Sequence, residues 1–331
     1  MADIPFRDLA KLQEQGFYAS EAARNKDIDR ALLRLYKDAY KKTVDDIAAL
    51  YAKVGLSTPA QTPSGPIYIR KEDAIRYNQL ANKLQNLADE MTRLRNAGVK
   101  LTEETSAQAI RDGYYRNVWA YGQAVGVKLG IPALPLAAIR AAVYSDDSGL
   151  DLIQTWKKNT YDSLVKTQSA IMRGITNGDS YTKIARSIKD QFDRGLSDAL
   201  RVVRTEAGRC WSEGAENAHQ QALDSGLNVR KRWSSTLDKR TRSSHGRLDG
   251  QYADENGLFW INGFSAPQPR EFGSPEIDIN CRCSTVDILD GIEPSVRRIR
   301  GEGIVPYTTF KDWAEPRGWT ADKGWPKVKL S

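Results

Sequence analysis

The sequence predicts a mainly α-helical protein with a small α+β module, in which long helices pack on a module of short strands and an extended tail ends the chain. Apolar residues recur every three or four positions through much of residues 28–223, which is the spacing of one helical face. Alternation with a period of two, typical of strands, begins only at Val229. The 331 residues, of which 40% are hydrophobic and 27% charged, suffice for about two folded domains.

The first half of the chain is predicted to be helical with one interruption. Residues 1–55 form an N-terminal helical segment, and the Pro- and Ser-rich residues 56–68 form a linker because they break every helical spacing. A helical region follows over 69–148. Within it we expect one helix to stop at Gly98, where Asn-Ala-Gly is typical of a left-handed C-cap, and another to start at Thr102.

The second half is predicted to combine helices with strands in a module over 149–290. Its three helices are expected over Leu152–Ile175, Tyr181–Phe192 and Asp198–Leu223, each bounded by capping residues. The alternating run from Val229 to Leu237 predicts one strand. A second such run, which contains Ile277, Ile279, Cys281, Cys283 and Thr285, predicts another.

Residues 291–331 are predicted to be an aromatic and basic C-terminal tail. It carries Arg297 and Arg298, and later Phe310, Trp313 and Trp319, among several Gly and Pro residues. Such a tail can dock through its aromatic rings but is too short to build its own core.

Composition excludes several classes of protein. No apolar run is long enough to span a bilayer and the N-terminus lacks a signal-peptide pattern, so we expect no membrane partner and synthesis in a cytoplasm. Three cysteines cannot form a disulfide framework, and reduced thiols are expected. The net charge of +7 is far below the charge density of a dedicated DNA-binding protein but is compatible with contact to a polyanion, so charge alone decides nothing.

One segment is locally more basic than the rest of the chain. Between residues 230 and 247 a single acid, Asp238, accompanies a group of cations. A solvated basic face is one interpretation, and contact with DNA phosphates is the other. The residues of this predicted basic cluster are Arg230, Lys231, Arg232, Lys239, Arg240, Arg242 and Arg247.

An imidazole and two thiols offer the ligands of a zinc site. His245 is expected one turn into a short helix after Thr241, and Cys281 and Cys283 are expected on one face of a strand. Asp238 is predicted as the fourth ligand, with Asp249 and Asp278 as alternatives. The single His and the Cys-x-Cys pair are far apart in sequence, so the other interpretation is a hydrogen-bonded histidine beside two buried apolar thiols.

Arg204 lies on the apolar stripe of the helix predicted over Asp198–Leu223. Because burial of an unpaired guanidinium costs several kcal/mol, we expect it to reach a carboxylate, with Asp238 and Asp249 as first candidates. Arg204 is thereby expected to fasten the long helix to the two strands in one structural cluster, called here the polar knot. Its predicted members are Arg204, Glu206, Asp238, Arg240, Thr241, His245, Asp249, Asn280, Cys281 and Cys283.

Common enzyme motifs are absent from the sequence, and no catalytic residue is assigned. There is no phosphate-binding Gly-x-x-x-x-Gly-Lys loop, no Gly-x-Ser-x-Gly elbow and no His-Glu-x-x-His pair. With His219 expected to be structural, His245 beside the basic cluster is the one place for acid–base chemistry on a phosphodiester. A nucleic-acid-processing or effector enzyme centred there is the alternative function.

The order of these motifs resembles the head-morphogenesis domain of phage minor head proteins, the Mu F-like family. The resemblance covers about residues 150–290 and rests on Arg204-Thr-Glu, Trp233, Asp238-x-Arg-Thr, His245, Leu248-Asp-Gly and Asn280-Cys-Arg-Cys. It implies a minor capsid protein at the portal vertex that acts in procapsid assembly and in DNA packaging or ejection.

The same resemblance implies the partners and the location. The portal protein is the expected partner, with the scaffolding or major capsid protein as further ones and phage DNA bound without sequence preference. The expected location is the virion, inside the head, after assembly in the host cytoplasm. Some relatives carry a cysteine at the position of Arg242 and another metal-type ligand at that of Asp278, and these relatives resemble true zinc sites. Because this chain has neither of those ligands, no cofactor is expected here, with zinc as the alternative.

Overall fold

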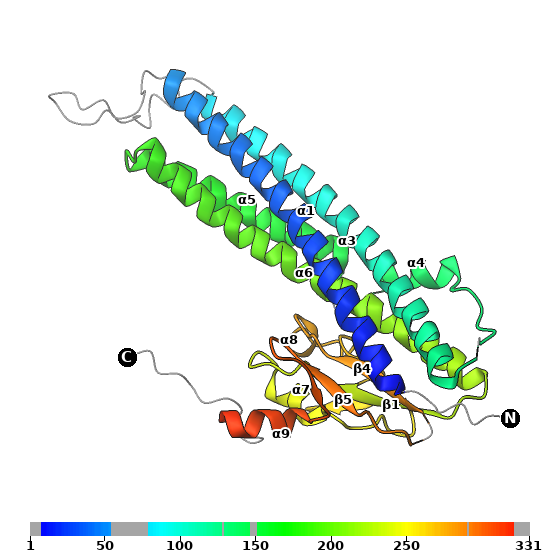
Figure 1. Ribbon diagram of the computed structural model, residues 1–331. Helices are drawn as coiled ribbons and strands as arrows, with labels where there is room; N and C mark the ends of the chain where they lie inside the picture. Colours follow the sequence, from blue (N-terminus) through cyan, green and yellow to red (C-terminus); the bar gives the residue numbers. More distant parts are fainter. Residues whose placement is uncertain (1–7, 54–78, 128, 146–150, 290, 321–331) are drawn as a thin grey trace. The chain divides into compact units, whose positions relative to one another are not determined.

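The computed structural model describes residues 8–53, 79–127, 129–145, 151–289 and 291–320 (Figure 1). Long helices dominate it and short strands follow in the second half, so the predicted fold class is confirmed. The predicted linker over 56–68 and the expected boundary at 148 lie outside the described residues. The longer helices are α1 (Leu9–Lys53), α3 (Gln79–Val125), α4 (Leu136–Tyr144), α5 (Leu152–Thr176) and α6 (Tyr181–Asp224).

The chain forms two compact units, each assembled from separate stretches of sequence. One unit, the module unit, contains Met1–Asn25, Glu103–Leu150 and Val203–Ser331, and the other, the helical unit, contains Lys26–Thr102 and Asp151–Val202. The helices α1, α3 and α6 each contribute to both units. The predicted ranges 1–55, 69–148 and 149–290 do not coincide with these units, because helices longer than forty residues carry the chain from one unit into the other.

In the helical unit, the predicted helix end at Gly98 is wrong, because this glycine serves packing inside a continuous α3. A Cβ atom at Gly98 would lie 2.3 Å from the Trp156 ring of α5. The Trp156 Nε1 atom donates to Thr102 Oγ1 at 3.1 Å, and Thr102 Oγ1 in turn donates to the carbonyl of Gly98 at 2.7 Å. The glycine therefore lets a fully buried indole seat against the helix backbone.

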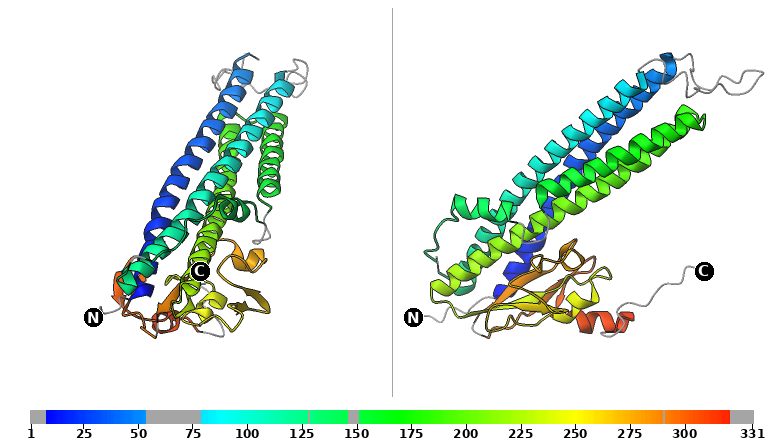
Figure 2. Two further views of the ribbon diagram at one scale, coloured as in Figure 1. Left: turned by 90° about the vertical axis from the view of Figure 1, so that its right-hand side faces the viewer. Right: turned by 180° about the vertical axis from the view of Figure 1, so that it is seen from behind.

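The predicted break between Phe192 and Asp198 is also wrong, since α6 runs through both segments. A Cβ atom at Gly195 would lie 3.0 Å from Tyr36 and from the Ser163 hydroxyl, so this glycine too allows close packing. The tertiary contacts outweigh the capping signal of Ser197. All three views show α5 alongside the N-terminal part of α6 (Figures 1 and 2).

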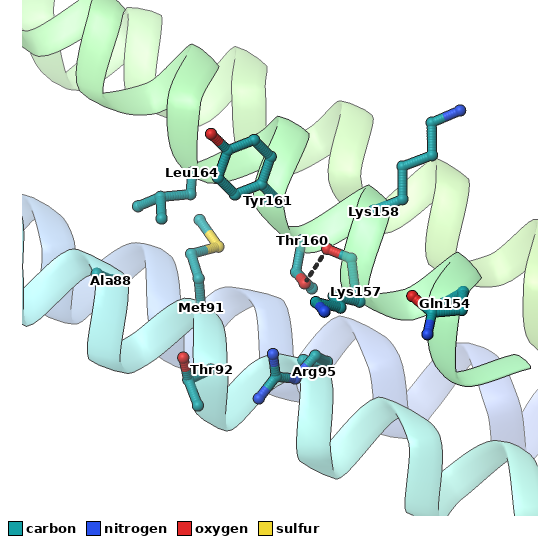
Figure 3. Close-up of a pocket in the computed structure, with 10 residues that line it drawn as sticks. All are labelled: Ala88, Met91, Thr92, Arg95, Gln154, Lys157, Lys158, Thr160, Tyr161 and Leu164. Atoms are coloured by element: carbon teal, nitrogen blue, oxygen red, sulfur yellow. Dashed lines mark hydrogen bonds between the residues drawn. The ribbon is translucent and has the colours of Figure 1, made fainter.

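The helical unit carries one basic hollow, of about 470 Å³, between α3 and α5 (Figure 3). Arg95, Lys157 and Lys158 line it, and no acidic residue is among its described lining. The sequence interpretation did not single out this group, because its cations lie about sixty residues apart on two helices.

In the module unit, the helices pack so closely that two glycines are required. A Cβ atom at Gly113 of α3 would lie 2.2 Å from the carbonyl oxygen of Trp211, and one at Gly214 of α6 would lie 2.1 Å from that of Ile110. The backbones of α3 and α6 are therefore in contact. Around this crossing, apolar residues of α1, α3, α4 and α6 form a core with Val229 and Leu289 of the strands.

Three two-stranded antiparallel sheets lie in the described part of the module unit. Strand β1 (Val229–Ser234) pairs with β4 (Ser284–Leu289), with Trp233 opposite Thr285. The hairpin partners are β2 (Phe259–Ile261) with β3 (Phe264–Ala266), and β5 (Val296–Ile299) with β6 (Gly303–Pro306). Short helices α7 (Ser243–Leu248) and α8 (Pro275–Asp278) lie between the strands.

The second predicted strand begins later than the alternation suggests. Ile277 lies in α8, and Cys281 and Cys283 lie in the segment between α8 and β4. The turn after α8 is made at Asn280, whose φ of 58° is left-handed. Burial alternates only from Asn280 to Cys283, and there without strand pairing.

The described part of the predicted tail, residues 291–320, is folded. After the β5–β6 hairpin come α9 (Phe310–Ala314) and a 3₁₀ turn at Glu315–Arg317. As expected, its aromatic rings dock: Phe310, Trp313 and Trp319 pack with Leu237 and Ile299 in one cluster. Residues 321–331, which include Trp325, lie outside the described part.

Candidate functional site

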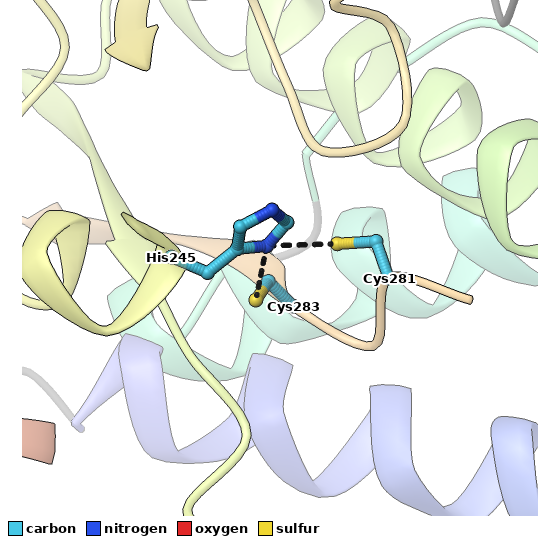
Figure 4. A group of neighbouring side chains, drawn as sticks. All are labelled: His245, Cys281 and Cys283. Carbon is cyan, nitrogen blue, oxygen red and sulfur yellow. Dashed lines mark hydrogen bonds between the residues drawn. The ribbon is translucent and has the colours of Figure 1, made fainter. Parts of the chain in front are cut away.

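The structure brings His245, Cys281 and Cys283 together (Figure 4). His245 comes from α7, and its Nδ1 atom lies 3.5 Å from the Sγ atom of each cysteine. All three side chains are buried, with exposed fractions of 2 to 5%. The predicted convergence of the imidazole and the two thiols is therefore what the structure contains, although the cysteines are not on a strand.

An aromatic shell surrounds this group and controls its electrostatics. Trp233, Phe259 and Phe272 pack with both cysteines in one core cluster, and Trp233 meets the His245 ring edge-on. Burial raises the pKa of the Cys281 thiol, but its hydrogen bond with Cys283 and the nearby charge of His245 outweigh burial and bring that pKa well below 9.0. Burial and the neighbouring Cys281 raise the pKa of Cys283 well above it.

Asp238 is not part of the His–Cys group, so its predicted role as a zinc ligand is wrong. Both of its carboxylate oxygens bind the Arg282 guanidinium, one of them at 2.7 Å, and Oδ1 also accepts the backbone N–H of Arg240 at 2.8 Å. Burial raises the pKa of this carboxyl, but the Arg282 hydrogen bonds and charge outweigh it and hold the pKa below 3.8. Arg282 lies between the two cysteines, so Asp238 anchors the segment that carries them.

Asp249 forms the buried ion pair that fastens the C-terminal hairpin. Its two oxygens accept from Arg297 Nη1 at 2.6 Å and Nη2 at 2.5 Å. They also accept the backbone N–H groups of Ser235 at 2.7 Å and Phe310 at 2.6 Å. The two side chains are 1 and 2% exposed, and the Glu14 carboxylate of α1 lies 3.7 Å from Arg297 Nε.

The two carboxylates named as first candidates for Arg204 have other arginine partners, and its role as a fastener stays a prediction. Arg204 is half-buried, and the two acids proposed for it are engaged by Arg282 and Arg297. The fully buried arginine of α6 is Arg209, whose Nε donates to Glu206 at 3.1 Å. Glu206 is therefore the partner of Arg209 one turn further along the same helix, and its membership of the knot stays a prediction.

Arg270, which the sequence did not single out, fastens the cysteine segment to α6. Its buried guanidinium donates to the carbonyl of Cys281 at 2.8 Å, to that of Gly208 at 3.1 Å and to the Ser212 hydroxyl at 3.2 Å. It thus connects α6 to the cysteine segment. The signal in the sequence was a glycine, Gly208, within the helix. The structure explains it, because a Cβ atom there would lie 2.5 Å from Arg270 Nε.

The remaining predicted members of the knot have local roles. The Thr241 hydroxyl donates to the carbonyl of Thr236, which closes the turn before α7. Asn280 is exposed, and its backbone N–H donates to the Thr205 hydroxyl at 3.1 Å. Arg240 is 70% exposed, with its Nη2 atom 3.9 Å from Asp238. The predicted single knot is thus several separate connections.

Sequence reasoning missed a second buried polar cluster, centred on Asp287 of β4. Asp287 accepts hydrogen bonds from Gln13 Nε2 of α1 at 3.0 Å and from the Tyr121 hydroxyl of α3, and it lies 2.8 Å from His219 Nδ1 of α6. This one carboxylate therefore joins three helices to the sheet. The available signal was a charged residue in the middle of an apolar strand.

The predicted basic cluster divides into buried and exposed cations. Lys231 and Arg232 are buried in ion pairs with Glu216 and Glu293. The Arg242 guanidinium binds the carbonyls of Ile277 and Ile279. The exposed members are Arg230, Lys239, Arg240 and Arg247. The seven cations are therefore not all exposed, because strand β1 buries Lys231 and Arg232, and contact of the exposed ones with DNA stays a prediction.

Comparisons with known proteins agree with the sequence resemblance. Residues 165–286 match the family model described as Phage Mu protein F like protein. The chain is 26% identical over 250 residues to Minor head protein GP7 of Bacillus phage SPP1, covering 74% of this chain and 81% of that protein. Both matches are to phage head proteins, and they support the phage minor head protein family, with the family model covering less than half of the chain.

A further relative carries the name of an enzyme. The chain is 29% identical over 300 residues to NAD(+)--arginine ADP-ribosyltransferase EFV of Enterococcus faecalis, covering 89% of this chain. The chain spans 60% of the length of that protein. An uncharacterized protein of Haemophilus influenzae is 28% identical over 146 residues, which is 44% of this chain and 29% of that one.

The remaining findings concern solved structures and membrane spans. No solved structure matches the chain. Within the described residues, no helix combines the length and the apolar character that a membrane span requires.

Proposed function

We propose that this protein is a minor capsid protein of the virion that binds the portal protein at the portal vertex and acts in procapsid assembly and in DNA packaging or ejection. The matches to phage head proteins support the role in the head. Host cytoplasm as the place of assembly, the scaffolding or major capsid protein as a further partner, and non-specific contact with phage DNA belong to the same proposal.

The observation that carries this proposal is an apolar hollow on the module unit. It measures about 620 Å³ and lies at the C-terminal end of α3 and in the segment that follows. No charged residue is among its described lining, and Tyr115, Trp119 and Val127 are 47, 56 and 54% exposed. Large apolar side chains gathered on an exposed face are typical of protein–protein contacts.

The fold makes this hollow suitable for docking. Its helix is fixed to α6 by the Gly113 and Gly214 contacts and to the sheet through the Tyr121–Asp287 hydrogen bond. A partner that binds there meets a surface whose geometry is already set, so little conformational entropy is lost on binding.

The test is co-purification with the portal ring of the phage that encodes the chain. Wild-type protein is expected to co-purify, and Trp119→Ala is expected to weaken binding at least tenfold, since exposed tryptophans at interfaces often contribute more than about 1.4 kcal/mol. Trp260→Ala is the matched control, because Trp260 is 54% exposed on strand β2 of the same unit. Equal binding by both variants would refute the assignment of this surface.

The alternative, an enzyme centred on His245, is not favoured by the geometry. His245 is 2% exposed, and its Nδ1 atom faces two thiols. An acid–base catalyst must come within hydrogen-bond reach of its substrate, and a nucleic-acid strand cannot enter a closed aromatic shell. The transferase activity in the name of the Enterococcus relative is tested by incubating the chain with labelled NAD⁺ and an arginine acceptor, where we expect no transfer.

A further inference from the structure

We propose that His245, Cys281 and Cys283 bind one zinc ion, which joins α7 to the segment in front of β4. This inference does not depend on the portal-binding proposal, because it concerns how the module unit is held together. It rests on the positions of three atoms, His245 Nδ1 and the two Sγ atoms.

The distances among these atoms fit tetrahedral zinc. With Zn–S bonds of about 2.3 Å and Zn–N bonds of about 2.05 Å, a tetrahedral angle places a ligand nitrogen and a ligand sulfur about 3.6 Å apart. The structure has both sulfurs at 3.5 Å from Nδ1, and all three atoms lie within 4.8 Å of one another. A metal ion can be bound without moving any of the three residues substantially.

Hydrogen bonding alone accounts poorly for the arrangement. A neutral imidazole nitrogen has one lone pair or one proton, so Nδ1 can make one good hydrogen bond. Two sulfurs nevertheless lie at the same distance from it. The other ring nitrogen, Nε2, is buried and has no hydrogen-bond partner among the described residues. The polar contacts of the ring among the described residues are therefore those between Nδ1 and the two sulfurs. A metal ion shared by these three atoms explains that arrangement.

The surrounding residues hold the ligands in place. The carbonyl of His245 accepts from the Ser235 hydroxyl at 2.8 Å, and that of Cys281 accepts from Arg270 Nε at 2.8 Å. The Arg242 guanidinium binds the same segment through the carbonyls of Ile277 and Ile279. The ligand loop is thus fixed from both sides before any metal binds.

The protein supplies three ligands, and a water molecule takes the fourth position. No other His, Cys, Asp or Glu among the described residues joins the group. The nearby carboxylates have other partners: Asp238 binds Arg282, Asp249 binds Arg297, and Asp278 accepts the backbone N–H groups of Phe272 and Ser274. Two thiolates and an imidazole select zinc over the oxygen-preferring magnesium and calcium.

Elemental analysis of the full-length chain tests the proposal. Protein produced with zinc and exhaustively dialysed is expected to contain about one equivalent per chain. Cys281→Ser and Cys283→Ser are expected to lose most of it. Cys210→Ser is the matched control, because Cys210 is also a buried free thiol but lies in α6 beside the Ala142 carbonyl, and it is expected to retain the full equivalent.

Cobalt binding to the wild-type chain gives a test that needs no variant to fold. Metal-depleted protein titrated with Co²⁺ is expected to show thiolate-to-cobalt charge transfer and the intense visible absorption of tetrahedral cobalt, both saturating at about one equivalent and both lost on adding zinc. Wild-type protein without zinc and without these bands would overturn the proposal. Zinc that is lost equally from Cys210→Ser and Cys281→Ser would also overturn it.

Discussion

The buried pair Asp249–Arg297 gives the sharpest prediction about stability. Asp249→Ala would leave a guanidinium that is 2% exposed without its two-point partner. It would also leave the backbone N–H groups of Ser235 and Phe310 without an acceptor. Removal of one partner from a buried pair costs about 3–5 kcal/mol. Because Glu14 lies 3.7 Å from Arg297 and compensates part of the charge, we expect about 3 kcal/mol.

The assay is thermal and urea unfolding of the variant beside wild type. A loss of about 3 kcal/mol corresponds to a lower Tm by roughly 6–12 °C for a folded unit of this size. Asp193→Ala is the control, because Asp193 forms an exposed pair with Lys189 and should change stability by less than about 0.5 kcal/mol. Adding Arg297→Met to Asp249→Ala should recover part of the loss, since it removes the unpaired charge.

The reasoning would be refuted by an Asp249→Ala chain that unfolds like wild type. It would also be refuted by a double variant whose loss equals the sum of the two single losses, because coupling between the two charges is what the structure requires.

Three further predictions concern other parts of the chain. Burial lowers the pKa of His219, but its hydrogen bond to Asp287 outweighs burial and raises that pKa above 6.5. The stabilisation of the fold by this contact is therefore fully present below pH 6.5 and disappears as the pH rises through the pKa of the folded state. His219→Gln should therefore destabilise more at about pH 5.5 than at about pH 8.5 in urea unfolding, and an equal loss at both would contradict this. Gly98→Val should lower the free energy of unfolding by about 1–3 kcal/mol, because the valine side chain would clash with the Trp156 ring. An unchanged melting curve would show that the indole does not pack against this position. In filter binding to double-stranded DNA, Arg240→Ala should lower the slope of log K against log salt by about one, whereas an unchanged slope would exclude this arginine from phosphate contact.

The helices and the position of the strands could be predicted from the sequence because burial periodicity determines both. The helix ends could not, for a physical reason seen at Gly98 and Gly195. A glycine that terminates a helix and a glycine that allows a neighbouring ring to approach have the same local sequence. Only the presence of Trp156 or Tyr36 in three dimensions distinguishes them.

The candidate site was predictable where chemistry restricts the residue type. Histidine and cysteine are rare in this chain, so their convergence could be expected before their positions were known. Arginines are numerous and their side chains are long, and sequence spacing did not reveal which one is buried. The contacts of Arg270, Arg282 and Arg297 follow from loop paths that no periodicity encodes.

The most direct test of the central claim is the protein content of phage heads. Heads purified from a lysate of the phage that encodes this chain should contain it in a low copy number relative to the major capsid protein, and it should stay with the portal when the shell is dissociated. Its absence from purified heads, with the whole amount recovered as free protein in the lysate, would contradict the account.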